Sequence, residues 1–331
     1  MSLREPDVEI VGGGVIGLAI AWRLARAGVH VRVLDAGAPG AASNAAAGML
    51  SVSWEFHRET PLLHLAQAAL KMYADFVETL SADAGMSIDY IECGAIQRPE
   101  DDSKWNAFAA EARHQEELGI ACEIQDDEVF FPEDSVVDPR EVVAALTRAC
   151  SVHGIEIRNG ATVESIDARG RTTVLAAGCW SSAIPVVDGK RTLEPPPVRP
   201  VKGHLIAYQM PPGSLQHILR SGFTYILQRS NGYTVAGSTL EHAGFDARID
   251  PAICREIHQR AGRLWPALRG QQPIECWTGL RPEIADGNPA LGRFEETNVW
   301  LAYGHYRNGI LLAPITAELI ATEIIASLGK D

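Results

Sequence analysis

Residues 8–35 alternate between apolar runs and a glycine cluster in a regular order. Residues 8–11 form a short β-branched run, and residues 12–17 then read G-x-G-x-x-G. Between residues 15 and 27, apolar side chains recur every three or four positions, the period of a helix with one buried face. Residues 29–34 form a second β-branched run. This order predicts a strand, a tight turn, a helix and a second, parallel strand.

Helical periodicity recurs in four later stretches, at residues 62–80, 103–118, 139–153 and 251–264. Asp138 before Pro139 is typical of an N-cap followed by the first helical residue, so the third helix is expected to begin there. The apolar runs at 155–157 and 174–178 are too short for helices. They are predicted to be buried strands that return to the first sheet.

The middle of the chain changes to the pattern of β-hairpins. Residues 223–228 and 233–236 flank Asn231 and Gly232, and Asn-Gly is a strong signal for a hairpin turn. A further strand is expected at residues 205–208 because this run is short and apolar.

Pieces of the nucleotide-binding pattern thus lie at the start, middle and end of the chain. We predict an α/β fold (α+β overall) with two discontinuous domains. Residues 1–75, 135–198 and 276–331 are assigned to a Rossmann-like nucleotide-binding domain. Residues 76–134 and 199–275 are assigned to an antiparallel-sheet substrate domain.

The nucleotide is identified by an acid and by a run of small residues. Asp35 lies 18 residues after Gly17, close to the ~20 expected for the acid that binds a ribose 2′-hydroxyl. A carboxylate there would repel a 2′-phosphate, which excludes NADP. Residues 40–50 are mostly small and let the backbone approach a flat ring system, which favours FAD over NAD. The alternatives are a glycine turn that serves packing alone and a helix start packed on the sheet.

A second cofactor-facing loop is expected near the C-terminus. Residues 304–314 read GHYRNGILLAP and follow an apolar strand at 299–303. They place a polar loop at the start of a long helix, where free N–H groups and the positive dipole end face a ligand. Because this loop and the glycine turn lie at opposite ends of the chain, we predict that both contribute to one flavin site.

One arginine near a strand end is a candidate for substrate binding. Residues 276–283 read CWTGLRPE, which places Arg281 ahead of a turn. A planar guanidinium suits two-point binding of a carboxylate, which lysine cannot reproduce. A surface salt bridge is the alternative role for Arg281.

Composition narrows the partners. The formal charge of -13 argues against nucleic acid or an anionic membrane surface, because both would repel this protein. The N-terminus has no signal-peptide pattern. The apolar stretch 309–328 contains Glu318 and Glu323, so it is predicted to be an amphipathic helix and not a membrane span.

The cysteines indicate the compartment. All six are dispersed without a C-x-x-C pair: Cys93, Cys122, Cys150, Cys179, Cys254 and Cys276. In a chain of this length the pattern favours reduced, buried thiols over a disulfide framework or a zinc site. We therefore expect a cytoplasmic protein without a bound metal.

The loop at 304–314 and the motif W-x-G-L-R-P at 277–282 resemble signatures of the D-amino-acid oxidase family, in its glycine oxidase branch of the thiamine-biosynthesis type. The resemblance spans nearly the whole chain. It implies FAD-dependent oxidation of glycine and similarly small amino acids, with hydride transfer from Cα to flavin N5. The imine would hydrolyse to an oxo acid and ammonia, O2 would become H2O2, and in this family the imine can also feed thiazole synthesis. We further expect a homo-oligomer.

The resemblance also assigns residues, position by position. On the substrate side it assigns Arg281, Tyr225 and Arg307, with Met49, Leu240 and Phe223 as apolar pocket residues. Arg281 and Tyr225 would bind the carboxylate, and Arg307 would line both substrate and flavin. The FAD-contacting set comprises Gly12, Gly14, Val15, Ile16, Gly17, Asp35, Ala36, Ala42, Ser43, Ala47, Gly48, Met49, Val163, His305, Tyr306, Arg307, Asn308, Gly309, Ile310 and Leu311. Tyr225 could equally be an ordinary strand aromatic, and His305 is given no catalytic role.

Some features depart from the family pattern or leave alternatives open. Residues 164–173 form a short link where relatives usually have a fuller meander, and Phe223 stands where the branch can carry a polar residue. No cysteine follows Cys276, so FAD is expected to be dissociable, unlike that of sarcosine oxidases in the family. No His, Asp or Glu base is evident in the expected pocket, which suits hydride transfer without one. The alternatives are a D-amino-acid, sarcosine or proline oxidase or dehydrogenase, and a catalytically impaired flavin-binding protein.

Overall fold

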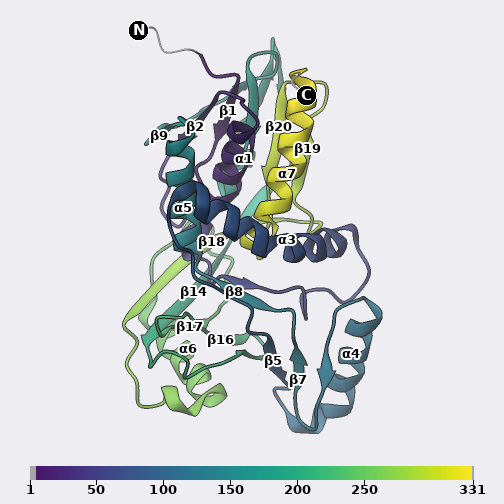
Figure 1. Ribbon diagram of the computed structural model, residues 1–331, viewed down its shortest axis with the longest axis vertical. Helices are drawn as coiled ribbons and strands as arrows, with labels where there is room; N and C mark the ends of the chain where they lie inside the picture. Colours follow the sequence, from purple (N-terminus) through teal and green to yellow (C-terminus); the bar gives the residue numbers. More distant parts are fainter. Residues whose placement is uncertain (1–4, 330–331) are drawn as a thin grey trace.

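The computed structural model describes residues 5–329 and has two halves, each built on its own sheet (Figure 1). The first sheet has six strands in the order β19-β20-β11-β1-β2-β9, all parallel except β19. Its strands are β1 (Val8–Val11), β2 (Val31–Asp35), β9 (Glu156–Asn159), β11 (Thr172–Leu175), β19 (Ala290–Arg293) and β20 (Val299–Tyr303). The predicted strands at both ends and in the middle of the chain therefore do meet in one parallel sheet.

Three helices cover this sheet: α1 (Val15–Arg26), α5 (Pro139–Val152) and α7 (Gly309–Ser327). A fourth, α3 (Pro61–Ala84), packs on α5 and α7. α1 packs against both α5 and α7. Local signals set the helix ends. Thr60 caps α3 by accepting a hydrogen bond from the Leu63 N–H at 3.1 Å, and Asp138 caps α5 in the same way through the Arg140 N–H. Gly85 ends α3 in the left-handed conformation.

The prediction that the C-terminal helix is amphipathic is wrong. Residues Ile310 to Pro314 of α7 are buried in succession, because α1 and α3 pack on it and the sheet lies beneath. The first half of α7 is thus apolar on every side, which is typical of a core position, whereas Leu319 and Glu323 in its second half are exposed. Among the described residues, α7 alone is long and apolar enough to cross a membrane, and 56% of that window is buried inside the protein.

The second sheet has eight strands in the order β18-β14-β17-β16-β15-β5-β7-β6. They are β5 (Ala95–Arg98), β6 (Glu123–Ile124), β7 (Val129–Phe131), β14 (Val198–Gln209), β15 (Ile218–Ser221), β16 (Thr224–Gln228), β17 (Tyr233–Gly237) and β18 (Glu275–Ile284). The predicted Asn231-Gly232 hairpin is present and joins β16 to β17. α6 (Pro251–Leu264) packs on β14 and β16, and α4 (Trp105–Glu117) lies beyond β7.

Two smaller sheets complete the fold. One three-stranded sheet is formed by β3 (Met49–Leu50), β8 (Ser135–Val137) and β4 (Tyr90–Ile91). Another is formed by β10 (Ile166–Asp167), β12 (Val186–Asp188) and β13 (Arg191–Leu193). The predicted short link at 164–173 is present, because β10 is only two residues long and the chain then enters β11. The remaining elements are α2 (Ala42–Ala45), η1 (Asp102–Lys104), η2 (Gly178–Ala183) and η3 (Pro266–Leu268).

Two predicted domain boundaries differ from the structure. Residues 276–284 were assigned to the nucleotide-binding half, but they belong to β18 in the second sheet. The reason is that β18 pairs with β14 over ten positions, from Val198 opposite Ile284 to Ala207 opposite Glu275. The predicted boundary after residue 75 falls inside α3, which continues to Ala84.

The prediction of six reduced thiols is wrong for two of the cysteines. Cys254 in α6 and Cys276 in β18 form a disulfide. Both pack against the apolar core of the second sheet. They are 22 positions apart in the sequence, and the fold brings them into contact. Cys93, Cys122, Cys150 and Cys179 are free. The inference of a reducing compartment therefore loses part of its basis.

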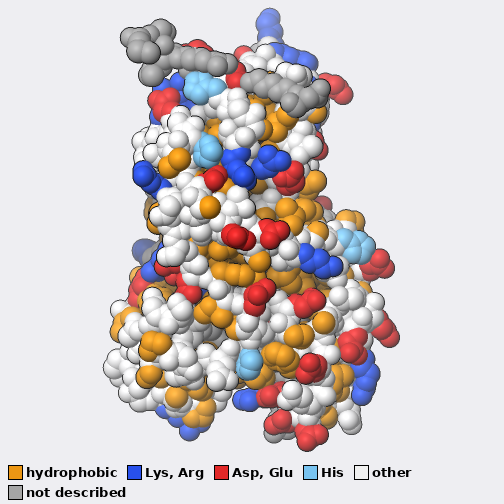
Figure 2. All heavy atoms as spheres, viewed as in Figure 1, with side chains coloured by type: hydrophobic (Ala, Val, Ile, Leu, Met, Phe, Trp, Pro, Cys, Tyr) orange, Lys and Arg blue, Asp and Glu red, His pale blue; other side chains and the backbone are white. Residues whose placement is uncertain are grey.

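Acidic side chains are spread over the middle and lower parts of the face in Figure 2, and basic side chains occur there singly or in small groups. This distribution agrees with the net charge of -13.

We expect Cys276→Ser to lower the free energy of unfolding by ~3 kcal/mol, because closing a loop of 22 residues restricts the unfolded chain. Denaturant unfolding with and without a reductant measures the effect, and the reductant should bring the wild type to the level of the variant. Cys122→Ser, which removes a free thiol, is the matched control and should change little. A wild type that is insensitive to the reductant would contradict the assignment of this disulfide.

Candidate active site

The glycine turn between β1 and α1 is shaped by backbone contacts that no side chain would permit. Gly12 has a φ of 116°, and a Cβ there would overlap the carbonyl of Ala176 on the neighbouring strand connection. A Cβ on Gly17 would overlap the carbonyl of Gly12. The turn therefore requires glycine at both positions, which explains the spacing of the motif.

The start of α1 is open to a ligand. Gly14 is its N-cap and offers no side chain to the helix. Ser43, in the run of small residues, accepts a hydrogen bond from the Val15 N–H at 3.0 Å, which ties the run to the turn. A Cβ on Gly14 would come within 3.0 Å of Ser43 Oγ, so this approach is also close. N–H groups at such a helix start suit a phosphate group.

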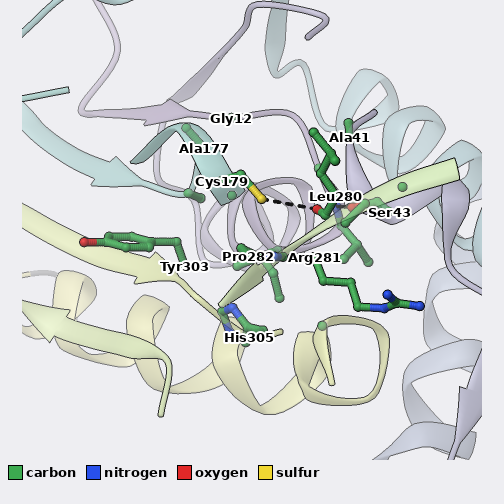
Figure 3. Close-up of a pocket in the computed structure, with 18 of the residues that line it drawn as sticks. Gly12, Ala41, Ser43, Ala177, Cys179, Leu280, Arg281, Pro282, Tyr303 and His305 are labelled. Atoms are coloured by element: carbon green, nitrogen blue, oxygen red, sulfur yellow. Dashed lines mark hydrogen bonds between the residues drawn. The ribbon is translucent and has the colours of Figure 1, made fainter. Parts of the chain in front are cut away.

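A cavity of about 620 Å³ extends from this turn to the second sheet. Figure 3 shows residues of the turn, of the small-residue run and of β18 around it, with Gly12, Ser43 and Arg281 among those drawn. The start of α7 borders the cavity as well, and its N-cap Asn308 makes no side-chain cap. Two open helix starts, a carboxylate at Asp35 and glycines that exclude side chains fit a dinucleotide with a flat ring system.

The structure brings together most residues of the predicted FAD set. Of the twenty positions, eighteen line the cavity: Gly12, Gly14, Val15, Ile16, Asp35, Ala36, Ala42, Ser43, Ala47, Gly48, Met49, Val163, His305, Tyr306, Arg307, Asn308, Gly309 and Ile310. Gly17 is not among the lining residues, because it packs against Gly12 and Ile10. Leu311 is 2% exposed and belongs to the hydrophobic core. Val163 keeps its place in the lining despite the short link that follows it.

Arg281 extends from β18 into the end of this cavity that borders the second sheet (Figure 3). Its Nη1 donates to the Thr239 carbonyl at 3.1 Å and its Nη2 donates to Ser238 Oγ at 3.2 Å. Burial lowers the pKa of Arg281 from its ordinary value. The guanidinium lies directly over Gly203 of the paired strand β14, where a Cβ would overlap it.

Tyr225 lines the same end of the cavity from β16. It is 9% exposed, and burial raises the pKa of its hydroxyl, while the positive charges of Arg281 and Arg307 act in the opposite direction. The phenol therefore stays protonated and remains a hydrogen-bond donor at neutral pH. Arg281 and Tyr225, predicted separately from the sequence, lie in one pocket because β16 and β18 belong to the same sheet.

A carboxylate that the sequence analysis missed also lines the pocket. Glu55 Oε1 lies 2.7 Å from Nη2 of Arg307, and the side chains of this pair are 18% and 35% exposed. Both residues also line an adjoining cavity of about 420 Å³, so the ion pair stands between the two spaces. From the sequence, no evident His, Asp or Glu base was expected in this pocket, and this acidic side chain, which is paired with Arg307, was not foreseen. The available signal was that Glu55 is the first charged residue after Asp35.

The segment that carries Glu55 is held by its neighbours. Trp54 has a φ of 62°, its N–H donates to Gln115 Oε1 at 2.9 Å, and its ring packs against Phe108 at a centroid distance of 4.7 Å. A tryptophan in this conformation is strained, so tertiary contacts must hold it.

Two predicted pocket residues lie outside the cavity. Phe223 is 66% exposed and Leu240 is 42% exposed, and neither lines it. Phe223 occupies the turn between β15 and β16, where strand alternation does not direct side chains. Leu240 lies in the link that leaves β17. The apolar part of the predicted pocket thus retains only Met49.

His305 has a structural partner. Its Nε2 lies 3.0 Å from Thr316 Oγ1 of α7, and burial lowers the pKa of His305 to about 3. The imidazole is therefore neutral at physiological pH, in agreement with the absence of a catalytic assignment.

The fold and the cavity are those of an FAD-dependent oxidoreductase. Residues 7–323 match the family model described as "DAO: FAD dependent oxidoreductase", and the chain belongs to this DAO family. The bifunctional protein ThiO/ThiG of Synechocystis sp. is 36% identical over 347 residues, covering 96% of this chain and 51% of that protein. The chain thus spans about half the length of such ThiO/ThiG relatives.

Other relatives match over nearly their full length. The glycine oxidase of Geobacillus kaustophilus is 30% identical over 95% of this chain and 92% of that protein. The crystal structure of a glycine oxidase from the same species superposes with a TM-score of 0.88 at 27% identity, covering 96% of this chain and 95% of the other. Glycine oxidase from Bacillus cereus ATCC 14579 also gives a TM-score of 0.88, at 25% identity, over 98% and 96% of the two chains.

We expect Gly12→Ala to weaken FAD binding at least tenfold, because a Cβ there meets the Ala176 carbonyl and the φ of 116° is unfavourable for alanine. Titration of the apoprotein with FAD, followed by flavin fluorescence, gives the affinity. Gly189→Ala is the control, since Gly189 also has a positive φ (63°) but has open space around it. Equal losses in both variants would show that backbone strain, and not the shape of the turn, determines the result.

Proposed function

We propose that this protein is an FAD-dependent oxidase of glycine and other small amino acids, with O2 as electron acceptor. The observation that carries the proposal is Arg281, whose guanidinium faces the FAD cavity. Its hydrogen-bond partners are a carbonyl and a hydroxyl, both neutral. Among the side chains that the structure describes, none of the ion pairs includes Arg281, and the carboxylate of Glu55 acts on it only at longer range. A buried guanidinium without an ion-pair partner favours binding of an anion, and the carboxylate of an amino acid supplies that charge.

The other side chains support an amino-acid substrate of small size. Tyr225 can donate its hydroxyl proton to the same carboxylate, which would fix the orientation of the α-carbon. The Glu55–Arg307 pair narrows the passage to the adjoining cavity, which favours a short side chain. When bound, FAD supplies the redox chemistry by accepting the hydride from the α-carbon. No proton transfer from the α-carbon to a protein base is needed.

The remaining parts of the proposal concern the cofactor linkage and the product. Cys179 lines the cavity, but burial raises the pKa of its thiol to about 12 and its Sγ donates to the Leu280 carbonyl at 3.2 Å. An un-ionised thiol is a poor nucleophile, which supports non-covalent FAD. ThiO/ThiG relatives join two functions in one chain. We therefore infer a link of the imine product to thiazole synthesis for thiamine. A cytoplasmic location and a homo-oligomeric state stay predictions from the sequence.

The central test is Arg281→Leu. Losing two charge-assisted hydrogen bonds to the carboxylate, each ~1.5–3 kcal/mol, should raise the KM for glycine by at least a hundredfold while FAD stays bound. Arg281→Lys keeps the charge but loses the two-point geometry, so it should restore only part of the affinity. An anaerobic titration with glycine, monitored by bleaching of flavin absorbance, measures binding and reduction together. An unchanged KM in Arg281→Leu would remove this arginine from the pocket.

A second variant tests the role of the ion pair. Glu55→Gln removes the partner of Arg307, and the freed guanidinium should attract a second carboxylate. We expect inhibition by malonate, a dicarboxylate, to strengthen two- to fivefold, because a partly exposed ion pair contributes ~0.5–1 kcal/mol. Inhibition by acetate, which has one carboxylate, serves as the control and should change less. If Glu55→Gln left the inhibition constants of malonate and acetate at their wild-type values, this pair would have no role in selecting ligands.

A further inference from the structure

One segment connects the flavin end of the cavity to its substrate end. Residues 47–49 line the cavity beside the glycine turn, Ser51 lines it further along, and Glu55 reaches Arg307. The only regular structure in this segment is the two-residue strand β3. Its position therefore depends on contacts from elsewhere in the fold.

The first contact comes from Arg229, the residue after β16. Its side chain is 3% exposed and donates to two backbone carbonyls, those of Ala47 and Val137. Its Nε lies 3.5 Å from the Asp138 carboxylate, and burial lowers the pKa of Arg229. Gly48 lies against both groups, since a Cβ there would overlap the Val137 carbonyl and come within 3.0 Å of Arg229 Nη1.

This contact acts on a peptide that lines the flavin site. A cation on the Ala47 carbonyl polarises the peptide between Ala47 and Gly48, which strengthens its N–H as a donor. The positive charge also lies directly behind Ala47 and Gly48, which line the cavity. Arg229 is thus placed to influence both the position of the peptide and the local potential.

The second contact comes from Arg220 on β15. Its Nη1 donates to Ser51 Oγ at 2.9 Å, and its Nη2 donates to Ser53 Oγ at 2.8 Å. Both serine hydroxyls donate in turn to Asp134 Oδ2 at 2.7 Å, and Asp134 lies 3.0 Å from Nη2 of Arg220. Arg220 is 5% exposed and Asp134 is 1% exposed, so the network is closed to solvent.

The two arginines come from one pair of strands. Arg220 on β15 lies opposite Tyr225 on β16, and Arg229 follows the end of β16 by one residue. The strand pair that carries Tyr225 therefore holds the connecting segment at two points. Buried ion pairs add little to stability compared with apolar packing, so stability alone does not account for two of them on one segment.

We propose that Arg220 and Arg229 are positioning residues that hold residues 47–55 in register with Tyr225. Arg229 fixes the flavin-facing peptide at Ala47 and Gly48, and Arg220 fixes the part that leads to Glu55. The proposal rests on the FAD site of the proposed function but does not depend on which amino acid is the substrate.

The flavin arm of the test uses Arg229→Met and Arg229→Lys. We expect Arg229→Met to raise the dissociation constant of FAD at least tenfold and to shift the midpoint potential of the bound flavin to a more negative value, since a buried positive charge is lost. Lysine keeps the charge but cannot donate to both carbonyls, so Arg229→Lys should restore the potential more fully than the affinity. Apoprotein titration and equilibrium reduction with dithionite give both quantities without turnover.

The substrate arm uses the double variant Arg220→Met with Asp134→Asn, which removes both charges together and avoids an unpaired carboxylate. We expect its FAD dissociation constant to stay within twofold of the wild type, and its KM for glycine to rise at least fivefold with a smaller change in kcat. Arg220→Lys serves where the double variant does not fold, and should show the same direction with a smaller change.

The matched control is Arg98→Met. Arg98 lies on β5 of the same sheet and pairs with Glu128 at 2.8 Å, but it does not contact residues 47–55. Arg98→Met is expected to lower only the melting temperature. The proposal would be overturned if the Arg229 variants did the same and left the FAD affinity and the midpoint potential of the bound flavin unchanged. If the wild-type protein binds FAD but glycine does not reduce the bound flavin, the proposal that glycine is the substrate is wrong. The measurements on the Arg229 variants still decide the role of Arg229.

Discussion

A guanidinium without an ion-pair partner is the constraint on which the proposed substrate site depends. Arg281 is kept among neutral groups, Ser238 and Thr239, at the edge of a cavity. The fold maintains this arrangement because β18 is paired along its length with β14, whose Gly203 leaves room for the side chain. A cation in such a place is costly unless an anion joins it, so the protein is prepared for an acid group before any ligand arrives.

The flavin site is built on the opposite principle, in which side chains are absent. Gly12, Gly14 and Gly17 allow backbone and helix starts to approach where any Cβ would interfere. Polar recognition then falls to N–H groups and helix dipoles, which cost no side-chain entropy on binding. The two principles meet along residues 47–55, which border both ends of the cavity. The acid Glu55 and the arginine Arg307, 252 positions apart, close this border.

Features set by residues close together in the chain were predicted correctly, and features set by contacts between distant elements were not. The βαβ unit, the Asn-Gly hairpin and the Asp138 cap of α5 depend on neighbours within a few tens of positions at most, and the structure confirms them. The disulfide, the apolar faces of α7 and the membership of β18 depend on which elements lie side by side, and those expectations needed correction. Phe223 and Leu240 were placed by resemblance alone, and the turn and the link that carry them direct their side chains to solvent.

The sequence by itself determined the nucleotide-binding turn, because only glycine tolerates its backbone and its spacing is visible without a fold. It also singled out Arg281 and Tyr225 as residue types suited to a carboxylate. Only the tertiary structure decided that these two share a pocket, that Arg281 lacks a counter-ion and that Glu55 stands beside Arg307. The physical reason is that charge compensation and burial are properties of atoms close in space, and residues far apart in the chain supply them.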